Sequence, residues 1–186
     1  MTEIPAIDIL EKNQHIISVV RDTTCHVFST MLGLSVTHIN AKVEKRATVP
    51  TEGIVAMVGM AGAVSGNGCV CFSKKFACQI ASRFLMAEYD EVNDDVLDAA
   101  AEIGNMVIGG LKTLLEDEMG VMGLSVPTVV FGDKYVTRSP SLGDRMVLTF
   151  ICEELGEEFS ILICLIPANQ NRSYLRELAE FHARLT

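Results

Sequence analysis

The sequence predicts an α+β domain in which two long helices pack on one face of a mostly antiparallel β-sheet. The expected elements follow one another as a helix, a run of strands, two helices, a second run of strands and a final helix. Helices and strands that do not alternate strictly are typical of an antiparallel sheet. The 186 residues suit one well-packed domain, whereas two would be cramped. Because each half of the chain offers one long helix that leads into several strands, we expect a single pseudo-symmetric domain, residues 1–186.

The first half of the chain is expected to begin with a helix and to continue with strands. Apolar side chains recur with helical spacing across residues 8–32. Residues 35–49 are rich in β-branched side chains and predict a strand that ends at Pro50. Two further strands, at 54–62 and 66–73, are expected to form a hairpin around the glycine-rich segment AGAVSGNG.

The second half opens with two expected helices. Residues 74–86 have helical spacing of apolar side chains, and the acidic segment 88–95 that follows is expected to be a solvated loop. The next helix is expected to run to about Met119, with Asp94 or Asp95 as its N-cap. This second helix is the longest one that the sequence predicts.

Strands and a short helix are expected to complete the chain. Pro127 opens a short strand, PTVVFG, and the segments RMVLTFICEE and EFSILICLIP predict an antiparallel pair across Leu155 and Gly156. The tail, at about 170–185, has the spacing of an amphipathic helix. We therefore expect the core of the domain to occupy about residues 8–167.

Composition and charge exclude several classes of protein. The net charge of −9 argues against nucleic acid as a partner, because phosphates require a basic surface. No apolar run approaches the roughly 18–20 residues that span a bilayer, and no secretory signal is visible, so a cytoplasmic protein without a membrane partner is expected. The six cysteines lack the spacing of a zinc site and are expected to be reduced and mostly buried.

The long helix expected to end at about Met119 carries an unusual polar stripe. At about 100° per residue, its polar stripe and its apolar face point in opposite directions. The stripe consists of Asp98, Glu102, Asn105, Gly109, Lys112 and Glu116. The apolar face, which we expect to contact the core, consists of Ala100, Ile103, Val107, Leu111 and Leu114.

Glycine and asparagine make this helix costly to form. Gly104, Asn105, Gly109 and Gly110 lie within seven residues, and each glycine in a helix interior costs about 1 kcal/mol relative to alanine. Carboxylates on an outer helix face are usually only solvated, but glycine removes bulk and lets another backbone or a partner approach closely. We therefore interpret the stripe as a docking face. The carboxamide of Asn105 cannot act as a general acid or base, but it can hold a water molecule in a chosen orientation.

These residues resemble a known signature. Asp98-x-x-x-Glu102-x-x-Asn105, with the downstream Pro127, resembles the CheC/CheX/FliY family of bacterial chemotaxis phosphatases, which dephosphorylate the response regulator CheY. The resemblance implies that Asn105 enters the active site of a phosphorylated receiver domain and orients the water that attacks its aspartyl phosphate. It implies that Glu102 pairs with the receiver's lysine. From their place on the stripe, Asp98, Gly109 and Lys112 are expected to contact the receiver. The resemblance also implies that Mg²⁺ belongs to the receiver and that this chain has no cofactor of its own.

The number of motifs points to one branch of that family. The best-matching frame in the first helix is Ser18-x-x-x-Asp22-x-x-Cys25, and a thiol cannot replace the paired donor and acceptor of a carboxamide. One motif per chain resembles the CheX type, which implies a homodimer. The alternative is a non-catalytic module that uses the same stripe to bind a receiver or a flagellar-switch partner. A small-molecule-binding domain is a third interpretation, although the sequence shows no polar cluster for a pocket.

Overall fold

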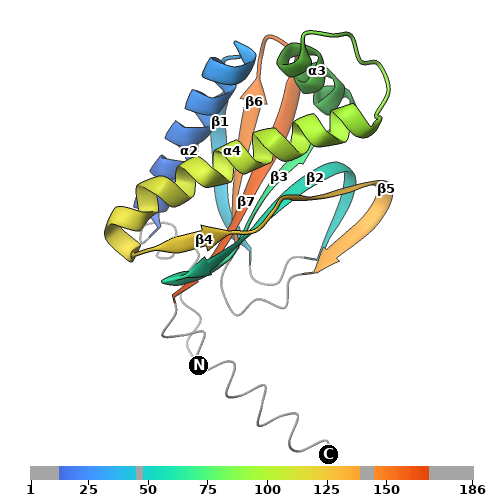
Figure 1. Cartoon of the computed structure of the whole chain (residues 1–186). Helices are drawn as coiled ribbons and strands as arrows, with labels where there is room; N and C mark the ends of the chain where they lie inside the picture. The colour runs from blue at the N-terminus through green and yellow to red at the C-terminus, as the bar shows by residue number, and fades with distance from the viewer. Residues whose placement is uncertain (1–12, 45–47, 139–144, 168–186) are drawn as a thin grey trace, which may run out of the picture.

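The computed structural model describes residues 13–44, 48–138 and 145–167, in which three α-helices lie on one face of a seven-stranded antiparallel sheet (Figure 1). The predicted fold class is thus confirmed. The elements are α2 (Gln14–Val27), the π-helical turn η1 (Phe28–Leu32), β1 (Thr37–Glu44), β2 (Thr48–Gly62), β3 (Val64–Phe72), α3 (Lys74–Leu85), α4 (Asp94–Met119), β4 (Met122–Leu124), β5 (Thr128–Arg138), β6 (Arg145–Cys152) and β7 (Glu157–Pro167). The helix expected at about 170–185 lies outside the described residues.

The strand order has the internal symmetry that the sequence suggests. The sheet runs β1-β6-β7-β3-β2-β4, and β5 pairs with the same side of β2 as β4. If β1, β2 and β3 are exchanged with β4, β6 and β7, respectively, the same strand order is obtained, read from the opposite edge of the sheet. The same exchange relates α2 to α4, since each helix precedes the edge strand of its half. The α4 stripe and the first-helix frame therefore occupy equivalent places in the two halves.

Both predicted hairpins are present. β2 pairs with β3, and β6 pairs with β7 across a turn in which Gly156 has a φ of 65°. The glycine-rich segment is not a loop, because only Ala63 separates β2 from β3. Gly68 lies within β3, and a Cβ there would lie 2.3 Å from the side chain of Ile108 on α4. This glycine lets α4 approach the sheet closely.

The strand boundaries differ from the prediction at three places. Residues 35–49 are not one strand: β1 ends at Glu44, and β2 begins at Thr48. β2 continues through Pro50 and through a register shift between Thr51 and Gly53, whose φ of 100° favours glycine. β5 is 11 residues long, and the three-residue strand β4 is not predicted, because it is too short to show an alternating pattern.

A cluster of phenylalanine rings packs between the helical layer and the sheet. Phe28 of η1 stacks on Phe159 of β7 with ring centroids 4.7 Å apart, and Phe76 of α3 lies 5.5 Å from the same ring. Such aromatic pairs contribute about 0.5–1.5 kcal/mol each beyond the area that they bury. The cluster fixes α3 and the end of the first helix on the sheet, so α4 has a rigid neighbour.

The buried face of α4 agrees with the prediction except near its end. Ala100, Ile103, Val107 and Leu111 are buried, but Leu114 is 51% exposed and Leu115 is buried in its place. The buried face therefore shifts by one residue at the last turns, which lie between β4, through Glu116 and Met122, and the start of α2, where His15 pairs with Glu118. The N-cap is also corrected: the side chain of Asn93, rather than Asp94 or Asp95, accepts a 3.0 Å hydrogen bond from the backbone N–H of Val96.

Candidate functional site

Two of the glycines in α4 are required by internal packing. A Cβ on Gly104 would lie 2.7 Å from the Cβ of Ala56 on β2, and a Cβ on Gly110 would lie 2.5 Å from the Cγ2 of Thr23 on α2. These residues let the helix touch the sheet on one side and α2 on the other. Of the two predicted alternatives, Gly104 thus serves the approach of another backbone and not that of a partner, since this glycine is buried against β2.

Gly109 differs from Gly104 and Gly110, because a Cβ at this position would not clash with a neighbouring element. The nearest atom to a Cβ at this position would be Cδ1 of Leu124, at the ordinary contact distance of 3.8 Å. Internal packing does not demand glycine here, so the cost of about 1 kcal/mol has no explanation inside the described fold. Of these three glycines, Gly109 is the one that fits the predicted approach of a partner.

The acidic and amide side chains of the stripe are presented to solvent. Asp98 and Glu102 are exposed and Asn105 is half-buried, while Ile103 between them is buried. At a rise of about 1.5 Å per residue, Asp98 and Asn105 lie roughly 10 Å apart along the helix. Within the described part of the chain, no hydrogen bond or ion pair engages the side chains of Glu102 and Asn105. Both are free to bind groups on a partner.

Lys112 is engaged within its own helix. Its Nζ lies 2.7 Å from Oε2 of Glu116, and Oε1 of Glu116 accepts a 2.9 Å hydrogen bond from the backbone N–H of Met122. The hydrogen bond from Lys112 and the one from Met122 hold the pKa of Glu116 below its usual range. Glu116 thus ties the end of α4 to β4, and the role of Lys112 in partner binding stays a prediction.

A second segment, the β4–β5 link at residues 125–127, borders the stripe and was not part of the predicted site. β4 and this link run alongside α4 in Figure 1. Ser125 anchors the link, because its backbone N–H donates to the Gly59 carbonyl and its Oγ accepts from the Gly59 N–H, both at 2.9 Å. The sequence offers no periodic signal for these residues, so only the fold places them beside the stripe.

The equivalent frame on α2 does not present a free motif. Ser18 Oγ donates to the carbonyl of His15, and Asp22 accepts a 2.8 Å hydrogen bond from Nε of Arg21. Cys25 Sγ donates to the carbonyl of Val36 at 3.3 Å, and burial raises the pKa of this thiol. This copy therefore offers a protonated thiol where the α4 copy has a carboxamide.

The described residues contain no group of three or more His, Cys, Asp or Glu side chains that could hold a metal ion. Burial raises the pKa of Cys69 to about 11 and that of Cys71 to about 12, so both stay protonated at neutral pH.

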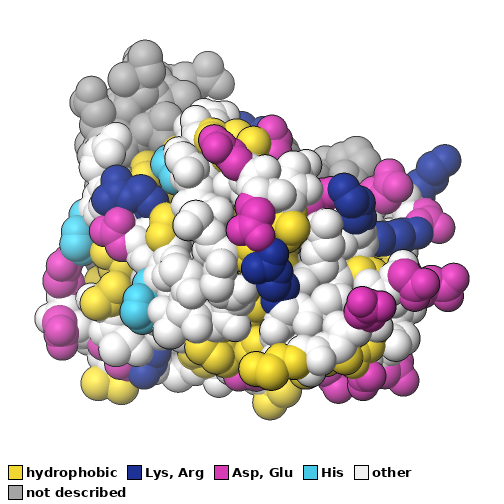
Figure 2. Space-filling model, turned by 90° about the horizontal axis from the view of Figure 1, so that it is seen from above, with side chains coloured by type: hydrophobic (Ala, Val, Ile, Leu, Met, Phe, Trp, Pro, Cys, Tyr) yellow, Lys and Arg dark blue, Asp and Glu magenta, His cyan; other side chains and the backbone are white. Residues whose placement is uncertain are grey.

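No helix in the described part of the chain is long and apolar enough to cross a bilayer. Figure 2 shows acidic and basic side chains mixed over one face of the molecule.

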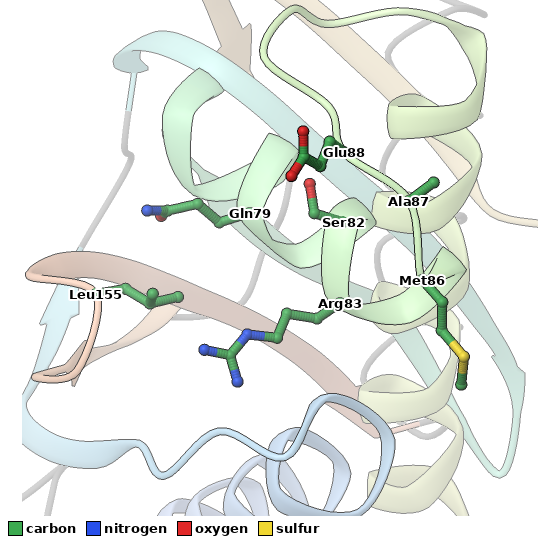
Figure 3. Close-up of a pocket in the computed structure, with 7 residues that line it drawn as sticks. All are labelled: Gln79, Ser82, Arg83, Met86, Ala87, Glu88 and Leu155. Carbon is green, nitrogen blue, oxygen red and sulfur yellow. The ribbon is translucent and has the colours of Figure 1, made fainter.

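Two cavities lie away from the stripe. One of about 390 Å³ is lined by side chains of α3, the loop after it and Leu155 of the β6–β7 turn (Figure 3). Another, of about 510 Å³, lies between the start of α3, residues 89–92 and Phe131. Neither of these two cavities includes a residue of the stripe.

Comparison with known proteins agrees with this arrangement. The family model described as "Chemotaxis phosphatase CheX" matches residues 54–151, which include the whole α4 stripe and Pro127. The protein "CheY-P phosphatase CheX" of Thermotoga maritima is 27% identical over 121 residues, which cover 62% of this chain and 78% of the relative.

Solved structures of similar proteins have the same fold. The chemotaxis protein CheX from Vibrio vulnificus aligns with a TM-score of 0.73 at 24% identity, over 82% of this chain and 99% of its own. The CheX–CheY–BeF₃–Mg²⁺ complex from Borrelia burgdorferi aligns with a TM-score of 0.66 at 22% identity, over 81% of this chain and 97% of its own. At these identities the structures establish the fold of this chain.

Proposed function

Because the chain belongs to the CheX family of chemotaxis phosphatases, we propose that it docks on a phosphorylated CheY-like receiver domain and accelerates hydrolysis of the receiver's aspartyl phosphate. The observation that carries the proposal is the α4 stripe, where Glu102 and Asn105 face solvent without a partner in the described part of the chain. The Thermotoga maritima relative is named as a CheY-P phosphatase, and the Borrelia burgdorferi relative was crystallised with CheY, which supports the choice of substrate.

In the proposed reaction Asn105 places the attacking water. The carboxamide oxygen accepts a hydrogen bond from this water, which directs the oxygen lone pair at phosphorus. A bond forms from the water oxygen to phosphorus while the bond from phosphorus to the receiver's carboxylate oxygen breaks, which yields inorganic phosphate and the free aspartate. Asn105 takes no proton in this step, since a carboxamide has no pKa in the useful range.

Glu102 sets the angle of approach in this proposal. It lies three residues before Asn105 on the same face of α4, so an ion pair with a lysine at the rim of the receiver's site would orient Asn105. Asp98, one turn further away, and the surface at Gly109 widen the same contact. Mg²⁺ bound to the receiver supplies charge stabilisation of the transferring phosphoryl group, and the complex from Borrelia burgdorferi contains Mg²⁺ together with CheY.

The decisive experiment is phosphate release from a phosphorylated CheY-like receiver of the same organism. We expect Asn105→Ala to lose at least about 100-fold in rate, because misplacement of the reacting atoms costs that much. Its stability should change by less than about 0.5 kcal/mol. Glu102→Ala and Glu102→Lys should weaken both turnover and binding to the BeF₃-loaded receiver. Asp117→Ala, an exposed change near the other end of α4, is the matched control.

The outcomes separate the candidate functions. Acceleration by the wild-type protein and none by Asn105→Ala would support water placement. Binding of the BeF₃-loaded receiver without acceleration would favour the non-catalytic docking module. Full activity of Asn105→Ala would contradict the mechanism, and absence of both binding and acceleration would contradict the choice of receiver.

The proposal extends to assembly and location. We propose a homodimer, since a single motif per chain resembles the CheX type, and sedimentation equilibrium would test it. A cytoplasmic location follows from the proposed substrate, because receiver domains of chemotaxis act in the cytoplasm.

A further inference from the structure

The β4–β5 link runs past Asn105. Met122 is bound to Glu116, and Leu124 lies beside Gly109, so β4 runs in the direction opposite to α4. A strand advances about 6.6 Å over two residues, which equals about four residues of helix. Because Ser125 continues the pairing with β2, a chain that stays extended for two residues beyond Leu124 brings Val126 to about the level of Asn105.

Pairing with β2 gives the same position independently. Leu124 pairs with Met60, and Ser125 continues this pairing by its two hydrogen bonds to Gly59. The next residue, Val126, therefore reaches the level of the β2 positions just before Gly59. A little further along β2, Ala56 touches Gly104, the residue before Asn105. Both routes place Val126 within about one helical turn of Asn105, and Figure 1 shows the link beside α4.

Val126 is an apolar side chain held rigidly in solvent. It is 84% exposed, although its neighbour Ser125 is anchored by hydrogen bonds to Gly59, and Ser125 Oγ also donates to the Val126 carbonyl at 2.9 Å. Single exposed apolar side chains are common on protein surfaces and need no explanation. This one is notable for its place: a valine on an anchored backbone loses little conformational freedom when a partner covers it.

We infer that Val126 is an apolar contact for the receiver domain, packing on the surface that borders the receiver's phosphorylated aspartate. This inference rests on the proposed function. If Asn105 reaches the phosphate, the receiver surface around the phosphorylated aspartate must contact the groups that flank Asn105. These groups include Gly109, one turn along α4, and Val126 on the β4–β5 link. Val126 positions the receiver and takes no part in the chemistry. Its contact is with an apolar side chain of the partner, because it offers no polar group beyond its backbone.

The chain offers a matched control for this inference. Val121 precedes β4 as Val126 follows it, and it is 83% exposed. It lies next to the C-terminal end of α4, about 20 Å along the helix from Asn105. Val126→Asp and Val121→Asp introduce the same charge at equal exposure, so they differ only in distance from the site.

The test is steady-state phosphate release from the phosphorylated receiver at varied receiver concentration. We expect Val126→Asp to raise KM at least tenfold, equivalent to about 1.4 kcal/mol, with kcat changed less than twofold. Val126→Ala should raise KM about threefold. Val121→Asp should change neither constant more than twofold, and thermal unfolding should show all three variants to be folded.

Three results would overturn the inference. KM unchanged in Val126→Asp would mean that the receiver does not cover this residue. An equal rise of KM in Val121→Asp would assign the effect to charge alone. A loss of kcat with unchanged KM would show that Val126 does not contribute to binding of the receiver. Failure of the proposed function is distinct, because the wild-type protein would then not accelerate phosphate release at all.

Discussion

Replacing Gly109 by alanine should stabilise the fold and impair receiver docking at the same time. Alanine in a helix interior is favoured over glycine by about 0.5–1 kcal/mol, because less backbone freedom is lost on folding. The added methyl would meet Cδ1 of Leu124 at 3.8 Å, an ordinary contact, so no packing cost offsets this gain. For a chain of this length the melting temperature should rise by about 1–4 °C.

The same methyl group would stand on the stripe one turn from Asn105. If the receiver approaches the helix backbone at this position, the methyl must be accommodated by a shift that also displaces Asn105. We expect at least a fivefold fall in kcat/KM for the phosphorylated receiver. Thermal unfolding followed by circular dichroism, together with phosphate release, measures both effects on one protein preparation.

Gly104→Ala is the matched comparison. A Cβ there would lie 2.7 Å from the Cβ of Ala56, and overpacking of this kind typically costs about 1–3 kcal/mol, which exceeds the gain in helix propensity. We expect this variant to melt below the wild-type protein. A stabilised Gly104→Ala would refute the packing argument. A stabilised Gly109→Ala with unchanged kcat/KM would refute the claim that a partner needs this glycine.

Two further predictions concern stability. Ser73→Ala removes the N-cap of α3, whose Oγ accepts a 3.0 Å hydrogen bond from the Phe76 N–H, and should lower the free energy of unfolding by about 0.5–2 kcal/mol in urea titrations; an unchanged midpoint would contradict this role of the cap. Glu116 has a pKa held below its ordinary value of about 4.5, so its contribution to stability is complete above that pH and is lost as the pH falls through the lower folded value. Glu116→Gln should therefore be less stable than the wild-type protein at pH 7, and the difference should shrink below about pH 4; a difference independent of pH would contradict the assignment.

The helix that carries the candidate site could be recognised without any knowledge of the fold. Its apolar residues recur every three to four positions, and this period is a property of the α-helix itself. The alignment of Asp98, Glu102 and Asn105 on one face follows from the same geometry, and the structure leaves all three at least partly accessible. The two hairpins were also recognisable, because each joins two short β-rich segments by a turn.

The purpose of each glycine could be decided only by the tertiary structure. Gly104 contacts Ala56 and Gly110 contacts Thr23, each of which lies more than forty residues away in the chain, so no local pattern distinguishes them from Gly109. The same limit applies to Val126, since its neighbour Ser125 is held on β2 by two hydrogen bonds to Gly59. The sequence by itself determined which face of α4 is polar, because helix periodicity is local. Only long-range packing decided which residues cover that helix and which part of it stays open to a partner.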